Sequence, residues 1–115
     1  MKINESETTR RTYYFLKSYK SLHKLAVREN DYGAFKDKAV EIVAEIEVYR
    51  DNLSELKREI FANLFTKRTR ERLKLHQLYE VLGIDKIEYE RLKAEVLLDF
   101  AKSYRKGVLL VYEQG

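Results

Sequence analysis

The stretch Leu75–Ala94, LHQLYEVLGIDKIEYERLKA, decides the predicted fold of this chain. Its apolar residues recur at helical spacing on both sides of Gly83, and glycine readily adopts the left-handed conformation in which helices end. Asp85 is followed three residues later by Glu88, which is the pattern of a capping box and predicts that a second helix begins there. The stretch therefore predicts two helices joined by a short turn, the layout of a helix-turn-helix.

Apolar side chains from both helices and from the turn supply the expected contact between them. They are Leu78, Leu82, Ile84, Tyr89 and Leu92. Tyr79 departs from the motif, which often has a small residue where its helices cross. An ordinary helical hairpin with a glycine turn is the alternative interpretation.

The rest of the chain is also predicted to be helical. It has 115 residues with no Pro and only 4 Gly, a composition that favours helices and supplies few strand turns. Helical periodicity predicts helices over about residues 6–28, 34–50, 52–65, 69–82 and 85–106. Asn52 and Thr69 are the expected N-terminal caps of the third and fourth helices, although the second and third could be continuous.

We therefore expect an all-α bundle of about five helices with a C-terminal helix-turn-helix. The length predicts one domain over residues 1–115, with a helical region at 1–66, the helix-turn-helix region at 67–106 and a tail at 107–115. The tail contains the apolar run Val108–Tyr112 without helical periodicity. It is predicted to form a short strand or an extended segment that folds back onto the core.

Several classes of protein are excluded by composition. The chain has no Cys and only two histidines, His23 and His76, so neither a thiolate site nor a zinc site is expected. Its carboxylates stand beside Lys or Arg, and no phosphate-binding loop or nucleophile motif is present. We expect a protein without enzymatic activity, metal or cofactor. No signal peptide or membrane span is apparent, so the expected location is the cytoplasm.

Positive charge is concentrated just before the predicted helix-turn-helix. The chain carries a net charge of +4, and residues 67–74 hold five cations and a single acid, Glu71. The cations are Lys67, Arg68, Arg70, Arg72 and Lys74. Cations at the start of a helix oppose its macrodipole, and bound phosphate would offset that cost. The cluster therefore predicts contact with a phosphate backbone, and a solvated helix start is the alternative.

The second helix of the motif is predicted to read DNA bases. Its first turns would present Lys86, Ile87, Glu90 and Arg91 to a major groove. Arginine can bond guanine O6 and N7, and glutamate can accept from the cytosine amino group. Lys86 and Arg91 are the principal candidates for base contact.

The run from Leu78 to Tyr112, LYEVLGIDKIEYERLKAEVLLDFAKSYRKGVLLVY, resembles the C-terminal part of the ArpU-type regulators of phage late genes. These are similar in style to the RinA activators and to the promoter-reading region of sigma factors. The matching features are the LGI turn, Tyr89, the Arg91–Leu92–Lys93 step, and LDFA followed by Tyr104. The resemblance covers about a third of the chain. It implies DNA binding through Lys86, Ile87, Glu90 and Arg91. The family activates late operons, which favours activation here, and repression and a contact with RNA polymerase are left open.

The sequence thus predicts a regulator of transcription that binds double-stranded DNA, an activator of phage late genes. A helical adaptor or modulator of the transcription machinery, without DNA contact, is the alternative, and the small subunit of a packaging machine is a third hypothesis. The aromatic cluster Tyr13, Tyr14, Phe15 and Tyr19 is the predicted contact between subunits of a homo-oligomer. Its neighbours Arg10 and Arg11 leave open stacking on single-stranded bases.

Overall fold

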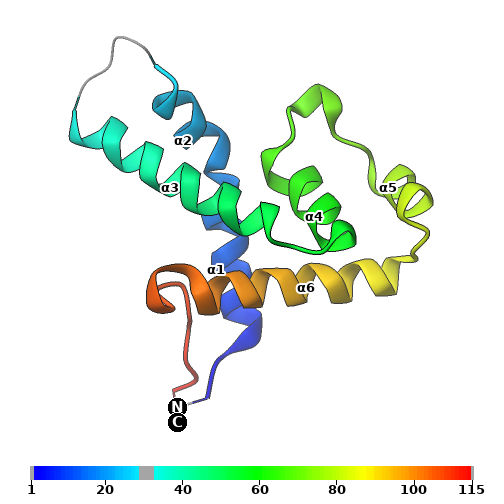
Figure 1. Ribbon diagram of the computed structural model, residues 1–115. Helices are drawn as coiled ribbons and strands as arrows, with labels where there is room; N and C mark the ends of the chain where they lie inside the picture. Colours follow the sequence, from blue (N-terminus) through cyan, green and yellow to red (C-terminus); the bar gives the residue numbers. More distant parts are fainter. Residues whose placement is uncertain (1, 29–32, 115) are drawn as a thin grey trace. The chain divides into compact units, whose positions relative to one another are not determined.

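The computed structural model describes residues 2–28 and 33–114 (Figure 1). Its helices are α1 (Glu5–Lys17), α2 (Tyr19–Ala26), α3 (Ala34–Asp51), α4 (Glu55–Phe61), a π-helix η1 (Ala62–Thr66), a 3₁₀ turn η2 (Thr69–Glu71), α5 (Leu75–Leu82), α6 (Lys86–Ser103) and a 3₁₀ turn η3 (Tyr104–Lys106). The prediction of an all-α protein is confirmed. Within the described ranges, β-structure is limited to one isolated bridge between Ile3 and Tyr112.

The first predicted helix is interrupted at Ser18, so the prediction of one continuous helix over 6–28 is wrong. Ser18 has φ −76° and ψ −8° and separates α1 from α2. The buried residues Thr12, Leu16 and Tyr19 keep helical spacing across the break. Periodicity therefore continues through the interruption, and neither Gly nor Pro marks it. The stop expected at Asn30 lies outside the described residues.

Two predicted helix starts are also wrong. Asn52 ends α3 instead of capping the next helix, because its side-chain amide donates to the Val48 carbonyl oxygen at 2.8 Å. A short connection then leads to α4, so α3 and α4 are not continuous. Thr69 lies in η2 and does not cap α5, which begins at Leu75.

The basic segment 67–74 is mostly extended, which overturns the argument from the helix macrodipole. Arg68, Arg72 and Lys74 all have ψ between 136° and 155°. Of the five cations, only Lys74 stands at the start of an α-helix.

The chain divides into two compact units. One unit is made of the first 16 residues and the chain from Leu73 onward, and the other is Lys17–Arg72. The units cut the chain differently from the predicted regions 1–66 and 67–106, since α1 belongs with the C-terminal helices. Helical periodicity identifies the buried face of a helix but not the distant segment that covers it, so this pairing was not expected.

The unit of residues 17–72, here called the middle unit, is built on α2 packed against α3 and on α4 with η1. Its core includes Ile46 and Phe61, both with no exposed surface. The Phe61 ring lies 5.6 Å from Tyr49 and 5.2 Å from Phe65. Tyr19 donates its hydroxyl to Glu47 Oε2 at 2.7 Å, and burial, followed by the Glu47 carboxylate, raises the pKa of Tyr19 to about 12.

The other unit, here called the terminal unit, pairs α1 with α5, α6 and the tail. Phe100 of α6 stacks on Tyr104, with ring centroids 5.0 Å apart, and lies 6.2 Å from Phe15 of α1. The tail begins with a turn over residues 107–110, and the residues after it form an extended segment, one of the two forms expected from the sequence. The Asn4 amide donates to the Val111 carbonyl at 2.7 Å, and the Val111 amide donates to the Thr8 hydroxyl at 2.9 Å. The two ends of the chain consequently lie side by side (Figure 1).

The aromatic cluster predicted to join subunits is largely used inside the fold. Tyr19 is buried and Phe15 packs on Phe100 and Tyr104. Tyr13 lies beneath the Lys93 ammonium, 5.1 Å from its ring centroid. Tyr14 remains 65% exposed. Self-association through this helix stays a prediction, and it would depend mainly on Tyr14.

Candidate nucleic-acid interface

The connection between α5 and α6 has the local geometry that the sequence predicts. Gly83 has φ 67° and ψ 35°, the left-handed conformation, and follows the last residue of α5. After it come Ile84 and Asp85, and Asp85 Oδ1 accepts from the Glu88 amide at 2.8 Å. This bond satisfies one of the free amides at the start of α6. The predicted stop at Gly83 and the cap at Asp85 are confirmed.

Aromatic packing joins α5 to α6 on the inner side of the turn. The rings of Tyr79 and Tyr89 lie 5.3 Å apart at 56°, and Leu78 and Leu92 are buried. Tyr79, the residue that departed from the motif, is therefore part of the contact between the helices. The Tyr89 hydroxyl is buried and finds no hydrogen-bond partner within the described ranges. Its burial, with the nearby Glu90 carboxylate next in effect, raises the pKa of Tyr89 to about 12.

The predicted base-reading residues lie exposed on the first turns of α6. Lys86, Glu90 and Arg91 are exposed, and Ile87 is 81% exposed. These four residues thus form one accessible face, here called the α6 face.

The guanidinium of Arg91 is already bound by carboxylates of its own helix. Its Nη1 donates to Glu95 Oε1 at 2.6 Å, and its other nitrogens donate to Glu88. These bonds, those to Glu88 first, raise the pKa of Arg91. Arg91 must give up at least part of this arrangement before it can bond a guanine.

The start of α6 carries more acid than base. Residues 85–95 contain four acids, Asp85, Glu88, Glu90 and Glu95, and three cations, Lys86, Arg91 and Lys93. A polyanion such as DNA is bound largely through neutralisation of its phosphates. The α6 face alone supplies little of that neutralisation, so its side chains suit recognition more than overall affinity.

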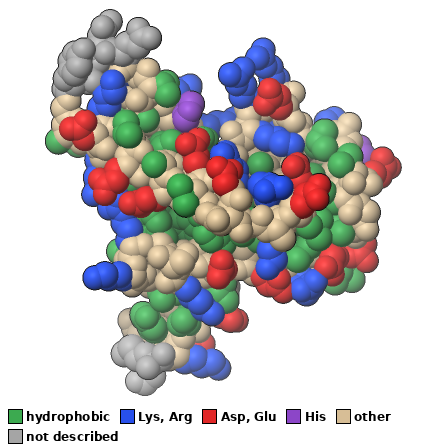
Figure 2. All heavy atoms as spheres, in the orientation of Figure 1, with side chains coloured by type: hydrophobic (Ala, Val, Ile, Leu, Met, Phe, Trp, Pro, Cys, Tyr) green, Lys and Arg blue, Asp and Glu red, His purple; other side chains and the backbone are tan. Residues whose placement is uncertain are grey.

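The five cations of the basic segment are divided between the two units. Arg68 and Arg70 are exposed, and Figure 2 shows Lys and Arg side chains gathered over η2. Lys67 is half-buried and pairs with Glu59, with Nζ 3.4 Å from Oε2. Arg72 is half-buried as well. These four belong to the middle unit, whereas Lys74 is exposed in the terminal unit together with the α6 face.

Arg72 serves as a clamp inside the middle unit. Its Nε donates to the Lys67 carbonyl at 3.0 Å and its Nη2 donates to the Phe65 carbonyl at 3.2 Å. These carbonyls lie at the C-terminal end of η1, where helices leave such groups without partners and where a cation is favoured. Arg72 thus closes the turn that follows η1.

We expect Arg72→Ala to lower the free energy of unfolding by about 1.5–3 kcal/mol, because charge-assisted hydrogen bonds to two carbonyls are lost. Urea unfolding followed by circular dichroism measures the change. Arg70→Ala is the matched control, since Arg70 is exposed and close in sequence, and it should change stability by less than about 0.5 kcal/mol. Equal stability of the two variants would show that the clamp contributes nothing.

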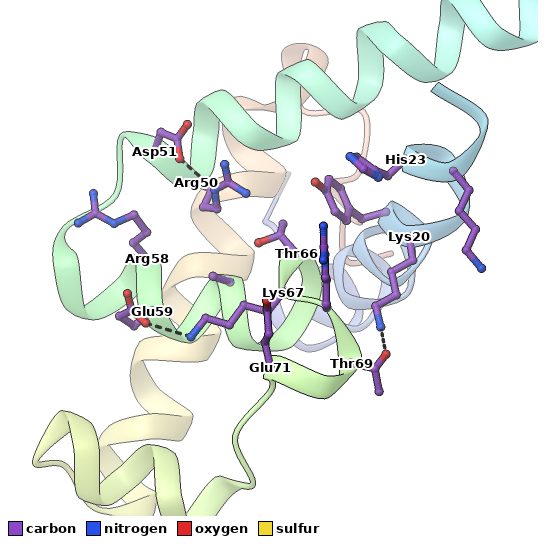
Figure 3. Close-up of a pocket in the computed structure, with 14 residues that line it drawn as sticks. Lys20, His23, Arg50, Asp51, Arg58, Glu59, Thr66, Lys67, Thr69 and Glu71 are labelled. Carbon is purple, nitrogen blue, oxygen red and sulfur yellow. Dashed lines mark hydrogen bonds and ion pairs between the residues drawn. The ribbon is translucent and has the colours of Figure 1, made fainter. Parts of the chain in front are cut away.

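A groove in the middle unit gathers further cations that the sequence did not single out (Figure 3). It has a volume of about 820 Å³ and is open to solvent. Its cationic lining residues come from α2, the end of α3, α4 and the segment after η1. They are Lys20, Lys24, Arg50, Arg58, Lys67 and Arg68, with His23 beside them. We call this feature the basic groove.

One signal in the sequence could have pointed to the basic groove. Lys20 and Lys24 are spaced four residues apart, which places them on one side of a helix. That α2 and η2 are neighbours could not be predicted, since Lys20 and Thr69, whose side chains hydrogen-bond, are 49 residues apart.

Neither metal-ligand clusters nor membrane spans are found in the described ranges. No group of three or more His, Asp or Glu side chains there could hold a metal ion. His23 lies against the ring of Tyr19, with centroids 5.6 Å apart. None of the described helices combines the length and the apolar character needed to cross a bilayer.

No protein-family model, curated protein or solved structure matches this chain. The resemblance to ArpU-type regulators therefore stays a prediction.

Proposed function

We propose that this protein binds double-stranded DNA and regulates transcription, with the start of α6 in the major groove. The observation that carries the proposal is the α5–Gly83–α6 turn, which ends in a capped helix whose first turns are exposed. In helix-turn-helix proteins the second helix contacts base edges through its N-terminal residues. Lys86, Ile87 and Glu90 occupy those positions here and are accessible.

The chemistry of these side chains suits base recognition. A lysine can donate to guanine, a glutamate can accept from cytosine, and an apolar side chain can contact the methyl group of thymine. Ile87 is 81% exposed and is therefore accessible for such a contact. Arg91 joins this set when a guanine replaces its bonds to Glu88 and Glu95.

We infer that the regulator acts as an activator of phage late genes, on the strength of the resemblance between residues 78–112 and the ArpU-type regulators. Activation implies a contact with RNA polymerase. The exposed aliphatic residues of α5, Val81 at 72% and Leu75 at 47%, offer a surface for such a partner.

The test is a Lys86→Ala, Ile87→Ala double variant, assayed on duplexes selected by the wild type from a random pool. We expect the preference for selected over random duplex to fall about tenfold or more, because the base contacts of both side chains are lost. Gel retardation of both duplexes measures the ratio.

The matched control is Val81→Ala together with Lys102→Ala, which removes the same kinds of side chain from exposed positions away from the α6 face. Its preference should equal that of the wild type. A double variant that keeps full preference would show that the α6 face does not read bases.

A second candidate function is a protein-binding module without DNA contact. Its support is the exposure of Val81 and Ile87 on either side of the turn, together with the excess of carboxylates at the start of α6. A wild-type protein that retards no duplex even at low salt would favour this function over the first.

A further inference from the structure

The basic groove of the middle unit has more cations than its own carboxylates can balance. Its lining contains six Lys or Arg residues but three acids, Asp51, Glu59 and Glu71. Asp51 is bound by Arg50, with Nε 2.9 Å from Oδ1, and Glu59 is bound by Lys67 (Figure 3). Two of the three acids are thus already occupied, which leaves an excess of positive charge on α2 and around η2.

Lys20 lies at the centre of this excess. Its ammonium donates to the Thr69 hydroxyl, which places it against η2 (Figure 3). Loss of solvent lowers the pKa of Lys20, and the charges that lower it further are all cationic: Arg72, Lys17 and Lys24. Positive groups therefore crowd around Lys20 and repel one another. A bound anion would relieve this repulsion.

The side chains not held by these ion pairs are suited to phosphate. Within the described part of the chain, the Arg68 side chain has no hydrogen bond or ion pair, and Lys24 has only the neighbouring cationic charge. A guanidinium can donate two parallel hydrogen bonds to a phosphate, and lysine ammonium groups bind phosphate as point charges. A groove of about 820 Å³ that opens to solvent can admit a chain of linked phosphates as well as a single ion.

We propose that the basic groove binds the phosphate groups of a nucleic-acid backbone through Lys20, Lys24, Arg58 and Arg68. The inference rests on the proposed function in one respect, the choice of duplex DNA as the polyanion. It extends that function by assigning overall affinity to the middle unit and base recognition to the α6 face. It also adds residues of α2 and α4 to the basic segment predicted from sequence.

The test removes three groove cations in a Lys20→Gln, Lys24→Gln, Arg68→Gln variant. Affinity for random duplex should fall about tenfold or more, and the slope of log K against log salt should become shallower by about 2–3, since each lost phosphate contact removes about 0.9. The preference of selected over random duplex should be kept. Loss of that preference is instead the result expected for variants of the α6 face. The effects of the two surfaces can therefore be told apart.

A control variant with the same loss of charge replaces Lys2, Lys38 and Lys102 by Gln, three exposed lysines outside the groove. It should keep at least most of the wild-type slope. Equal slopes for the groove variant and this control would overturn the proposal, because net charge and not the groove would then set the affinity. Circular dichroism confirms that both variants are folded.

A second readout does not depend on DNA. Titration of wild-type protein with tripolyphosphate, followed by NMR of the lysine ammonium groups, should shift the signals of Lys20 and Lys24 more than that of Lys38. Displacement of the bound duplex by single-stranded DNA and by tripolyphosphate is then compared. The comparison distinguishes binding of a nucleic-acid backbone from binding of free phosphate. If tripolyphosphate displaces the duplex as well as single-stranded DNA does at equal phosphate, the backbone assignment is wrong. If the signals of Lys20 and Lys24 do not move, the groove binds no phosphate.

Discussion

A Phe61→Ala variant is expected to lose about 3–5 kcal/mol of its free energy of unfolding, the usual cost of removing a fully buried ring. Phe61 has no exposed surface and contacts Tyr49 of α3 and Phe65 of η1 through its ring. Its removal leaves a cavity at the place where α3, α4 and η1 meet. Typical domains are stable by only about 5–15 kcal/mol, so this variant should be close to unfolding at moderate temperature.

Urea unfolding followed by circular dichroism measures this loss. Phe35→Ala is the matched control, because Phe35 of α3 is 86% exposed and its removal opens no cavity. A large loss in the control, or a loss below about 1 kcal/mol in Phe61→Ala, would contradict the core described for the middle unit.

The second large effect is expected in the terminal unit, where Phe100→Ala should also cost about 3–5 kcal/mol. Phe100 is 1% exposed. Its ring stacks on Tyr104 and lies 6.2 Å from the ring of Phe15 in α1. This variant therefore removes an aromatic contact between α1 and α6. Val108→Ala, a change at a 55% exposed position, serves as the control and should be near neutral.

Comparison of Phe61→Ala with Phe100→Ala tests the prediction of one domain over residues 1–115. If the two units unfold together, both variants shift the same single transition, and signals from residues of either unit report it equally. Tyr19 and Tyr89 supply NMR signals for the middle and terminal units. A variant that unfolds one unit and leaves the signals of the other unchanged would show two domains.

Features of the fold set by neighbouring residues could be predicted from the sequence. The left-handed Gly83 and the Asp85 cap depend on residues within one turn of each other, and both were found where expected. The helix break at Ser18 was missed because buried residues keep their spacing through it. Asn52 and Thr69 are residue types that often cap helices. Asn52 instead bonds back to the Val48 carbonyl oxygen. Thr69 lies in η2, and the segment held by the Arg72 clamp comes before α5 begins.

The candidate surfaces also differ in whether neighbouring residues or long-range contacts determine them. Exposure of Lys86, Ile87 and Glu90 follows from their place on an amphipathic helix and was predictable. Arg72 binds the carbonyls of Phe65 and Lys67, which come close together only where the π-helix ends. In the sequence only the charge of Arg72 is visible, and that charge suggested a phosphate ligand. The basic groove depends on α2 meeting η2, a long-range contact that no local pattern in the sequence records.

The most direct test of DNA binding is fluorescence anisotropy of a labelled random-sequence duplex, titrated with wild-type protein at several salt concentrations between about 50 and 200 mM. We expect binding at the lowest salt that weakens steeply as salt rises, together with tighter binding of duplexes enriched from a random pool. Anisotropy that does not change at the lowest salt, at protein concentrations well into the micromolar range, would contradict the proposed function.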